Sequence, residues 1–222
     1  CSDDPQAAFH AVRNLARIAR GMAVLRWSQL GFGRTSSTST SQDTPRNLMG
    51  FKDGTNNITA EEGDAVHRKH LWADRADGAN WMHDGSYMVT RHIRMLIEVW
   101  DRASLTDQEQ TFGRQKISGA PLGGIKEHDD PDFAAKDASG KPVIPLIAHM
   151  RLASPENNDG IRMLRRGYNF TDGFDPQLGQ LDAGLFFINY QRNPHEQFVP
   201  IQRRLGANDQ LNEYIIHRSS GL

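Results

Sequence analysis

The chain has 222 residues, of which 24% are charged, and its formal net charge at pH 7 is -1. A chain so close to neutral offers no electrostatic reason to bind nucleic acid or an anionic membrane, and no apolar stretch approaches the ~20 residues that a membrane-spanning helix needs. Cys1 is the single cysteine, which excludes an internal disulfide and a metal site built from several cysteines.

The first predicted element is a helix over residues 5–20. Asp4 is a suitable N-cap, Pro5 suits the first helical position, and Gly21 closes the pattern. A strand is predicted next over residues 24–32. The Ser/Thr-rich run 35–41 follows, and a flexible linker is one interpretation of it.

A second group of elements begins after an irregular polar stretch that ends at residue 84. Residues 86–101 alternate between apolar and polar side chains, which predicts one long half-buried strand. Thr106 and Glu109 have the spacing of a capping box and predict a helix over residues 106–114. The remaining predicted elements are short strands or turns over 143–154 and 161–170, a strand over 184–191, and a helix over 193–206.

This order of elements predicts an α+β fold made of ferredoxin-like units, with antiparallel sheets and packed helices. The last strand of the second unit is expected to be missing, because the sequence stops at "EYIIHRSSGL" in what looks like the middle of an element. We therefore expect a fragment of a longer protein.

Three positions are costly to bury and therefore informative. Asp53 lies between two glycines in the stretch "GFKDG", and His149 lies in an apolar run, where a hydrogen-bonded core histidine is the more usual finding. Arg165 and Arg166 are adjacent in a predicted strand, so one of them faces the interior and needs an anionic partner there. An acid, an imidazole and a guanidinium buried in one chain together indicate a functional site.

The other histidines carry weaker signals. His67 and His70 have a spacing that suits a metal on a helix, but their cationic neighbours favour a solvated face. His128 lies in the acidic stretch "KEHDDPD", for which a hydrated loop is favoured over a divalent-ion site.

The motif around Asp53 is accompanied by five further segments in a fixed order: 112–124, 127–133, 149–155, 163–170 and 179–191. With "NLMGFKDGT" they resemble the dye-decolorising peroxidases, a haem family, and are most similar to its exported A-type subgroup. Gly167 stands where another subgroup has a distal asparagine, so no such role is assigned. The resemblance implies two ferredoxin-like halves of the dimeric α+β barrel kind. Residues 1–84 would be the tail of the first half with the Asp53 loop, and residues 85–222 the haem-binding second half.

The resemblance also implies roles for single residues. Asp53 and Arg165 match the distal acid and the distal arginine, and His149 matches the proximal ligand of the haem iron. Asp182 is a candidate partner for the ring N–H of His149, and Arg114 is a candidate partner for a haem propionate. The positions that match haem-lining segments are Gly54, Thr55, Asn56, Ser154, Pro155, Leu185 and Phe187.

The activity that the resemblance implies is that of a peroxidase with one haem b per chain. It would reduce hydrogen peroxide and oxidise bulky aromatic dyes or phenolic donors. One alternative is a haem-binding protein that releases iron, because similar family members are linked to iron uptake. Another is a haem-free ferredoxin-like interaction module in which His149 is a core residue. The family resemblance implies that the longer parent protein is exported, to the periplasm or outside the cell. Whether it forms a homo-oligomer stays open.

Overall fold

A computed structural model describes residues 2–77 and 80–222 of the chain. It divides into two compact units between Leu30 and Gly31. Residues 31–77 and 80–84 thus belong to the same compact unit as residues 85–222. The assignment of residues 1–84 and 85–222 to two ferredoxin-like halves stays a prediction. In the described part of the chain, no helix has the length and apolar character to cross a membrane.

The first unit contains helix α1, Pro5–Ile18, and its capping confirms the prediction. The carboxylate of Asp4 accepts the backbone N–H of Gln6 at 2.8 Å, and Pro5 occupies the first turn. The strand predicted over residues 24–32 is wrong, since the first strand begins only at Phe32. Backbone pairing with strand β4 begins at Phe32, and that pairing defines the strand.

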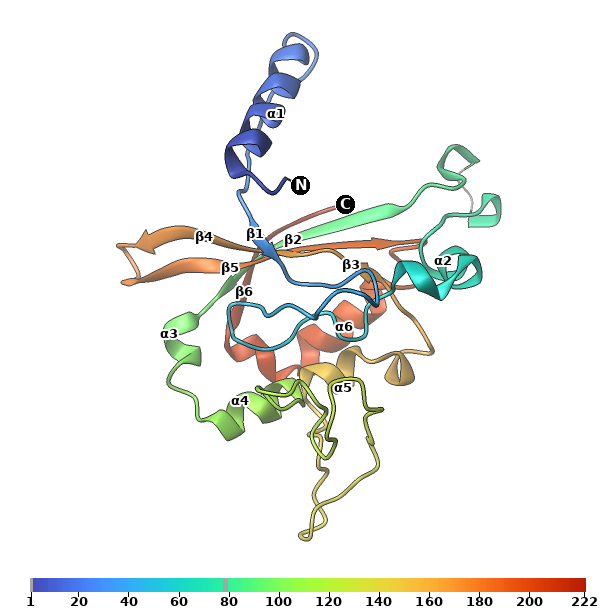
Figure 1. The fold of residues 1–222 in the computed structure, drawn as a ribbon, viewed down its shortest axis with the longest axis vertical. Coiled ribbons are helices and arrows are strands. Elements are labelled where there is room, and N and C mark those ends of the chain that lie inside the picture. Colours follow the sequence, from blue (N-terminus) through green and yellow to red (C-terminus); the bar gives the residue numbers. More distant parts are fainter. Residues whose placement is uncertain (1, 78–79) are drawn as a thin grey trace. The chain divides into compact units, whose positions relative to one another are not determined.

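The second unit is built on an antiparallel sheet with the strand order β1-β4-β5-β2-β6, and β3 also pairs with β5 (Figure 1). The strands are β1 Phe32–Arg34, β2 Tyr87–Met95, β3 Leu164–Arg165, β4 Tyr168–Asp175, β5 Gln180–Gln191 and β6 Ile215–Gly221. The sheet with its packed helices confirms the α+β class. Strand β6 pairs with β2 and takes the place of the strand that was expected to be missing.

Short helices complete the second unit. The α-helices are α2 Asp64–His70, α3 Ile97–Trp100, α4 Leu105–Phe112, α5 His149–Ala153 and α6 Phe198–Asn208. The 3-10 turns are Ala60–Glu62, Arg75–Asp77, Asn80–Met82, Pro155–Asn157 and Gln210–Glu213. Helices α4, α5 and α6 lie together on one side of the sheet (Figure 1).

Three further predicted elements differ from the structure. The long strand ends at Met95, because the chain turns into helix α3 two residues later. Helix α4 is capped by Ser104 rather than Thr106, and the Ser104 hydroxyl accepts the backbone N–H of Asp107 at 3.1 Å. The segment 143–154 contains helix α5, which at five residues is too short to show a helical period in the sequence.

The apolar residues around the Gly-x-x-Asp-Gly motif anchor it to the core. Met49 and Phe51 are 2% and 1% exposed. The Phe51 ring stacks on Phe112 with 4.2 Å between the ring centroids, and the indole N–H of Trp100 donates to the carbonyl of Met49 at 3.0 Å. The loop that carries Asp53 is therefore fixed to helices α3 and α4 by buried side chains.

Candidate active site

Glycine is required at position 54 for two reasons. Its backbone has a φ of +93°, and an added Cβ would lie 2.7 Å from the Cα of Ser36. Thr35, Ser36 and Ser37 are 1%, 2% and 6% exposed, so this part of the Ser/Thr run packs beneath the Asp53 loop. The interpretation of that run as a flexible linker is therefore wrong for these three residues.

Asp53 and Arg165 form an ion pair, although 111 residues separate them in the sequence. An Asp53 Oδ1 to Arg165 Nη1 distance of 3.2 Å joins the loop to strand β3. The second carboxylate oxygen accepts the Nδ2 amide of Asn47 at 3.3 Å. The two charged side chains are 19% and 29% exposed, so the pair is only partly shielded from solvent. Of the two adjacent arginines Arg165 and Arg166, Arg165 is thus the one that pairs with an acid at this site.

Asn57 holds the backbone of Arg165 in place. Its Oδ1 accepts the backbone N–H of Arg165 at 2.8 Å, and its Nδ2 donates to the carbonyls of Arg165 at 2.9 Å and of Ser37 at 2.8 Å. The residue is 4% exposed. Asn57 is therefore a positioning residue that joins the loop of Asp53 to the strand of Arg165.

Replacing Asn57 by alanine is expected to destabilise the protein by about 3 kcal/mol, because three hydrogen bonds of about 1 kcal/mol each are lost from a buried site. Urea unfolding of the full-length protein measures the change. Asn56→Ala, at the exposed neighbouring position, is the matched control and should leave the unfolding free energy within about 0.5 kcal/mol of the parent. Equal stability of the two variants would contradict the role of Asn57.

His149 begins helix α5 and is oriented by a buried acid. Its Nδ1 donates to Oδ2 of Asp209 at 2.6 Å, and the Asp209 side chain is 2% exposed. The other carboxylate oxygen of Asp209 accepts the backbone N–H of Leu211 at 2.9 Å, which fixes the carboxylate between α6 and the following turn. With Nδ1 engaged, Nε2 is the nitrogen left to bind a metal.

The electrostatics of His149 follow from this pairing. Burial opposes its protonation, but the charge of Asp209 and its hydrogen bond outweigh burial, and the pKa of His149 is raised. The predicted partner Asp182 is wrong, because its carboxylate lies 2.8 Å from Nη1 of Arg218. The correct partner comes from the end of helix α6 rather than from strand β5.

A cavity of about 410 Å³ lies among these residues. Its size falls in the range of ~300–1,000 Å³ that is usual for cofactor and small-molecule sites. The predicted site residues that line it are Asp53, Gly54, Thr55, Asn56, Arg114, His149, Ser154, Pro155, Arg165, Leu185 and Phe187. Asp182 is the one predicted site residue outside this lining.

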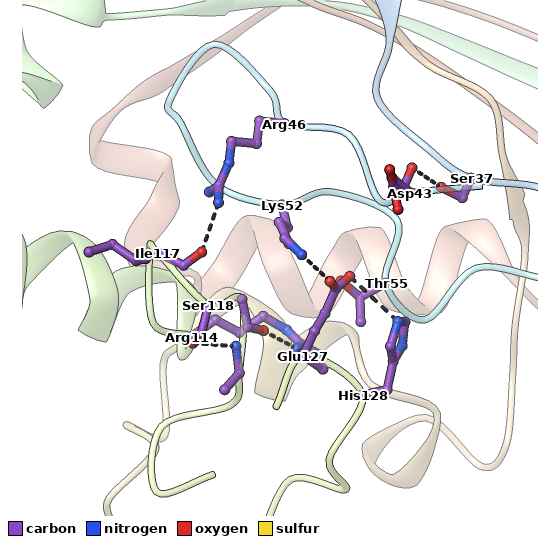
Figure 2. A network of polar contacts seen from close by, with 12 residues as sticks. Ser37, Asp43, Arg46, Lys52, Thr55, Arg114, Ile117, Ser118, Glu127 and His128 are labelled. Atoms are coloured by element: carbon purple, nitrogen blue, oxygen red, sulfur yellow. Dashed lines mark hydrogen bonds and ion pairs between the residues drawn. The ribbon is translucent and has the colours of Figure 1, made fainter. Parts of the chain in front are cut away.

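A polar network holds the loops at the cavity (Figure 2). Glu127 forms an ion pair with Lys52 and accepts the hydroxyl of Thr55 at 3.1 Å, on either side of Asp53 and Gly54. Nη1 of Arg114 donates to the carbonyls of Gly119 at 2.7 Å and Glu127 at 3.0 Å. Burial lowers the pKa of Arg114. Arg114 therefore fastens the 119–127 loop, and its role toward a propionate stays a prediction.

The residues of the cavity fit a haem. The cavity offers an imidazole whose second nitrogen is fixed by a carboxylate, an arrangement that is usual for metal-binding histidines. Apolar side chains from strands and helices form much of its wall: Ile93, Met95, Phe112, Leu185, Phe187, Ile201 and Leu205. Such a wall suits a flat apolar macrocycle. Within residues 2–77 and 80–222, no group of three His, Cys, Asp or Glu side chains is placed to hold a bare metal ion.

Sequence reasoning missed Asn47, Asn57, Glu127 and Asp209. Asn57 and Arg165 are 108 residues apart, and Asp209 and His149 are 60 apart, so no local pattern joins them. Asp209 carries one local signal, since an Asp at the end of a predicted helix suits the cap of a following turn.

The family model described as "Dyp-type peroxidase, C-terminal" matches residues 44–222. The chain belongs to the Dyp-type peroxidase family. A dye-decolorizing peroxidase of Thermobifida fusca is 42% identical over 225 residues, which cover 100% of this chain and 52% of the relative. A deferrochelatase of Yersinia pestis is 41% identical over 218 residues, covering 97% of this chain and 49% of the relative.

Solved Dyp-type structures share the fold. A peroxidase from Streptomyces coelicolor superposes with a TM-score of 0.91 at 41% identity, and the match covers 99% of this chain and 59% of that one. Ferric DtpA from Streptomyces lividans gives a TM-score of 0.90 at 41% identity, with the same coverage. The chain thus spans about half the length of the curated Dyp-type relatives that it matches.

Proposed function

We propose that the protein of which this chain forms part is a haem-dependent peroxidase that reduces hydrogen peroxide and oxidises bulky aromatic dyes or phenolic donors. The observation that carries this proposal is the placement of the Asp53–Arg165 pair and of His149 around one cavity. Membership of the Dyp-type peroxidase family supports it, as does the ferric state named for the similar DtpA structure.

The cofactor of the proposal is one haem b per chain, with Nε2 of His149 as the iron ligand. Haem, when bound, supplies the iron centre at which peroxide is reduced and from which donors are oxidised. Asp209 accepts the Nδ1 proton of His149, which orients the ring and increases its basicity as a ligand.

Asp53 and Arg165 have different roles in the reduction of peroxide. An ionised Asp53 accepts the proton of one peroxide oxygen and returns it to the other, which then leaves as water. Arg165, 3.2 Å from that carboxylate, stabilises the negative charge that develops on the leaving oxygen. Asn47 donates a hydrogen bond to the carboxylate of Asp53, and Asn57 accepts one from the backbone N–H of Arg165. These bonds hold the two groups next to each other.

A second candidate function is the release of iron from haem. Deferrochelatases of Yersinia pestis and of Escherichia coli K12 are 41% and 40% identical to this chain. Incubating the haem-loaded protein under reducing conditions and detecting metal-free porphyrin by fluorescence distinguishes this function from dye oxidation.

The rate of dye oxidation as a function of pH tests the proposed peroxidase. We expect an optimum at about pH 4–5, because a carboxylate base titrates near ~3.9 in water and a general base works best near its own pKa. Oxidation of the donor also consumes protons, which favours acid. An optimum at pH 7 or above, with no activity below pH 6, would instead indicate a histidine base. A missing Soret band in the purified full-length protein would contradict haem binding. It would favour the alternative function, a haem-free interaction module.

Export of the parent protein, to the periplasm or outside the cell, is a further part of the proposal. It is supported by the resemblance to the exported A-type subgroup, and cell fractionation followed by immunodetection tests it. Assembly into a homo-oligomer stays open, and light scattering of the full-length protein measures it.

A further inference from the structure

Arg91 is a cation of the cavity that lacks an acidic partner. It lies on strand β2 and lines the cavity together with Ile93 and Met95, which point to the same side of the sheet. Its Nε donates to the hydroxyl of Ser220 at 3.1 Å, but its Nη1 is buried and has no hydrogen-bond partner among the described residues. Burial lowers the pKa of Arg91, and the described residues place no carboxylate in an ion pair with it.

His217 presents a second unsatisfied polar group to the same cavity. It lies on the neighbouring strand β6, opposite Ile93, and lines the cavity. Its Nδ1 is buried and has no partner in the part of the chain that the structure describes. Burial, followed by the charge of Arg91, lowers the pKa of His217 to about 4, so the imidazole is neutral at pH 7 and can donate one N–H.

Six acids line the cavity, and none of the ion pairs among the described residues joins one of them to Arg91. Asp129 accepts two backbone N–H groups, and Asp130 and Glu156 are the other two beside the three pairs that follow. Asp53 pairs with Arg165, Glu127 with Lys52, and Asp209 with His149. A buried guanidinium nitrogen without a partner costs free energy, and such a group is satisfied by an anion brought by the ligand. Arg114 differs, because its Nη1 already donates to two backbone carbonyls.

We infer that Arg91, with His217 as a second donor, binds a carboxylate of the ligand in this cavity, namely a propionate of the haem. The inference rests on the proposed function and names residues for it. The guanidinium donates Nη1–H to a propionate oxygen, while the ring of Phe198, 5.9 Å from the Arg91 Cζ, covers the guanidinium.

The test compares two ligands that differ only in their carboxylates. The full-length apoprotein is titrated with ferric protoporphyrin IX and with its dimethyl ester, and binding is followed by Soret absorbance and by quenching of tryptophan fluorescence. In Arg91→Gln the affinity for the diacid should fall about 10-fold to 100-fold, which is the range expected for a hydrogen bond to a charged group. The affinity for the dimethyl ester should change by less than about threefold.

Two further variants complete the design. Arg218→Gln is the matched control, because Arg218 is the neighbour of His217 on β6, lies outside the cavity lining and pairs with Asp182. It should leave both affinities unchanged. His217→Phe should weaken the diacid about threefold to tenfold, the effect of losing a neutral hydrogen bond, and an unchanged affinity overturns the assignment of His217.

The outcomes separate the inference from the proposed function. If the parent protein binds neither ligand, the proposed function fails. If it binds the diacid and the ester equally, or if Arg91→Gln keeps the full preference for the diacid, the inference is overturned. Should Arg91→Gln fail to fold, Arg91→Lys serves instead, because it keeps the charge but loses the planar fork. Arg91→Lys should lose part of the preference for the diacid over the dimethyl ester. An unchanged preference again overturns the inference.

Discussion

Asp53→Asn and Arg165→Leu should each slow the reaction of the haem-loaded full-length protein with hydrogen peroxide by at least about 100-fold. Asparagine cannot take up the proton that Asp53 is proposed to move, and leucine cannot stabilise the charge on the leaving oxygen. The two groups are an ion pair with 3.2 Å between Oδ1 and Nη1, and they act on the same oxygen atoms. The double variant should therefore be little slower than the slower single variant, because groups that work as a unit are not additive.

Stopped-flow measurement of the Soret change after mixing with peroxide gives these rates directly. The matched controls are Asp182→Asn and Arg218→Leu, which remove an ion pair of the same residue types, 2.8 Å apart, outside the cavity lining. They should react at the parent rate. Parent rates for both Asp53→Asn and Arg165→Leu would contradict the assignment of the pair and leave the "GFKDGT" stretch as a tight turn beside the cavity.

The parts of the fold that the sequence predicts well have short-range signals. Helix α1 has its cap and proline within two residues of each other, and helix α6 has apolar residues at helical spacing. The strand predicted over residues 184–191 lies within β5, at Gln180–Gln191. Such signals depend on neighbouring residues, and the local backbone follows them.

The parts that escaped prediction depend on distant contacts. Helix α5 is five residues long, and its sequence has the apolar character of a buried strand. Strand β6 is recognisable as a strand only through its pairing with β2, more than 100 residues earlier. Asp182 and Asp209 are both acids near the end of an element, and only the folded chain shows which one reaches His149.

The Asp53 loop contains residues that were predicted from the sequence and neighbours whose burial was not. The resemblance to a known family identified Asp53 and Arg165, and both line the cavity. The Ser/Thr run beside the loop has the composition of a linker, yet Thr35 and Ser36 are buried beneath Gly54. Composition alone could not show this, because the burial of these small polar residues depends on a glycine that lets two backbones approach each other.

The second large effect is expected at His149, the proposed iron ligand. His149→Ala should abolish the imidazole-ligated spectrum of the full-length protein with haem and weaken haem binding by at least about 100-fold, since the protein's iron ligand is lost. Added imidazole should restore the ligated spectrum, because the cavity keeps its other walls. His195→Ala, at an exposed histidine outside the cavity lining, is the matched control. An unchanged spectrum in His149→Ala would show that another residue binds the iron.

The same histidine pair makes the stability of the apoprotein depend on pH with a defined sign. The pKa of His149 is raised in the folded protein, because the effect of Asp209 outweighs burial. The folded state therefore holds this proton more tightly than the unfolded chain, in which a histidine titrates near ~6.5. The resulting stabilisation is fully present below that pH and is lost as the pH rises through the folded pKa. Melting of the apoprotein between pH 6 and 9 should show this loss, whereas Asp209→Asn removes the charge that raises the pKa and should abolish or reverse it. An equal decline in both proteins would assign the pH dependence to other groups and contradict the electrostatic role of Asp209 toward His149, the proposed iron ligand.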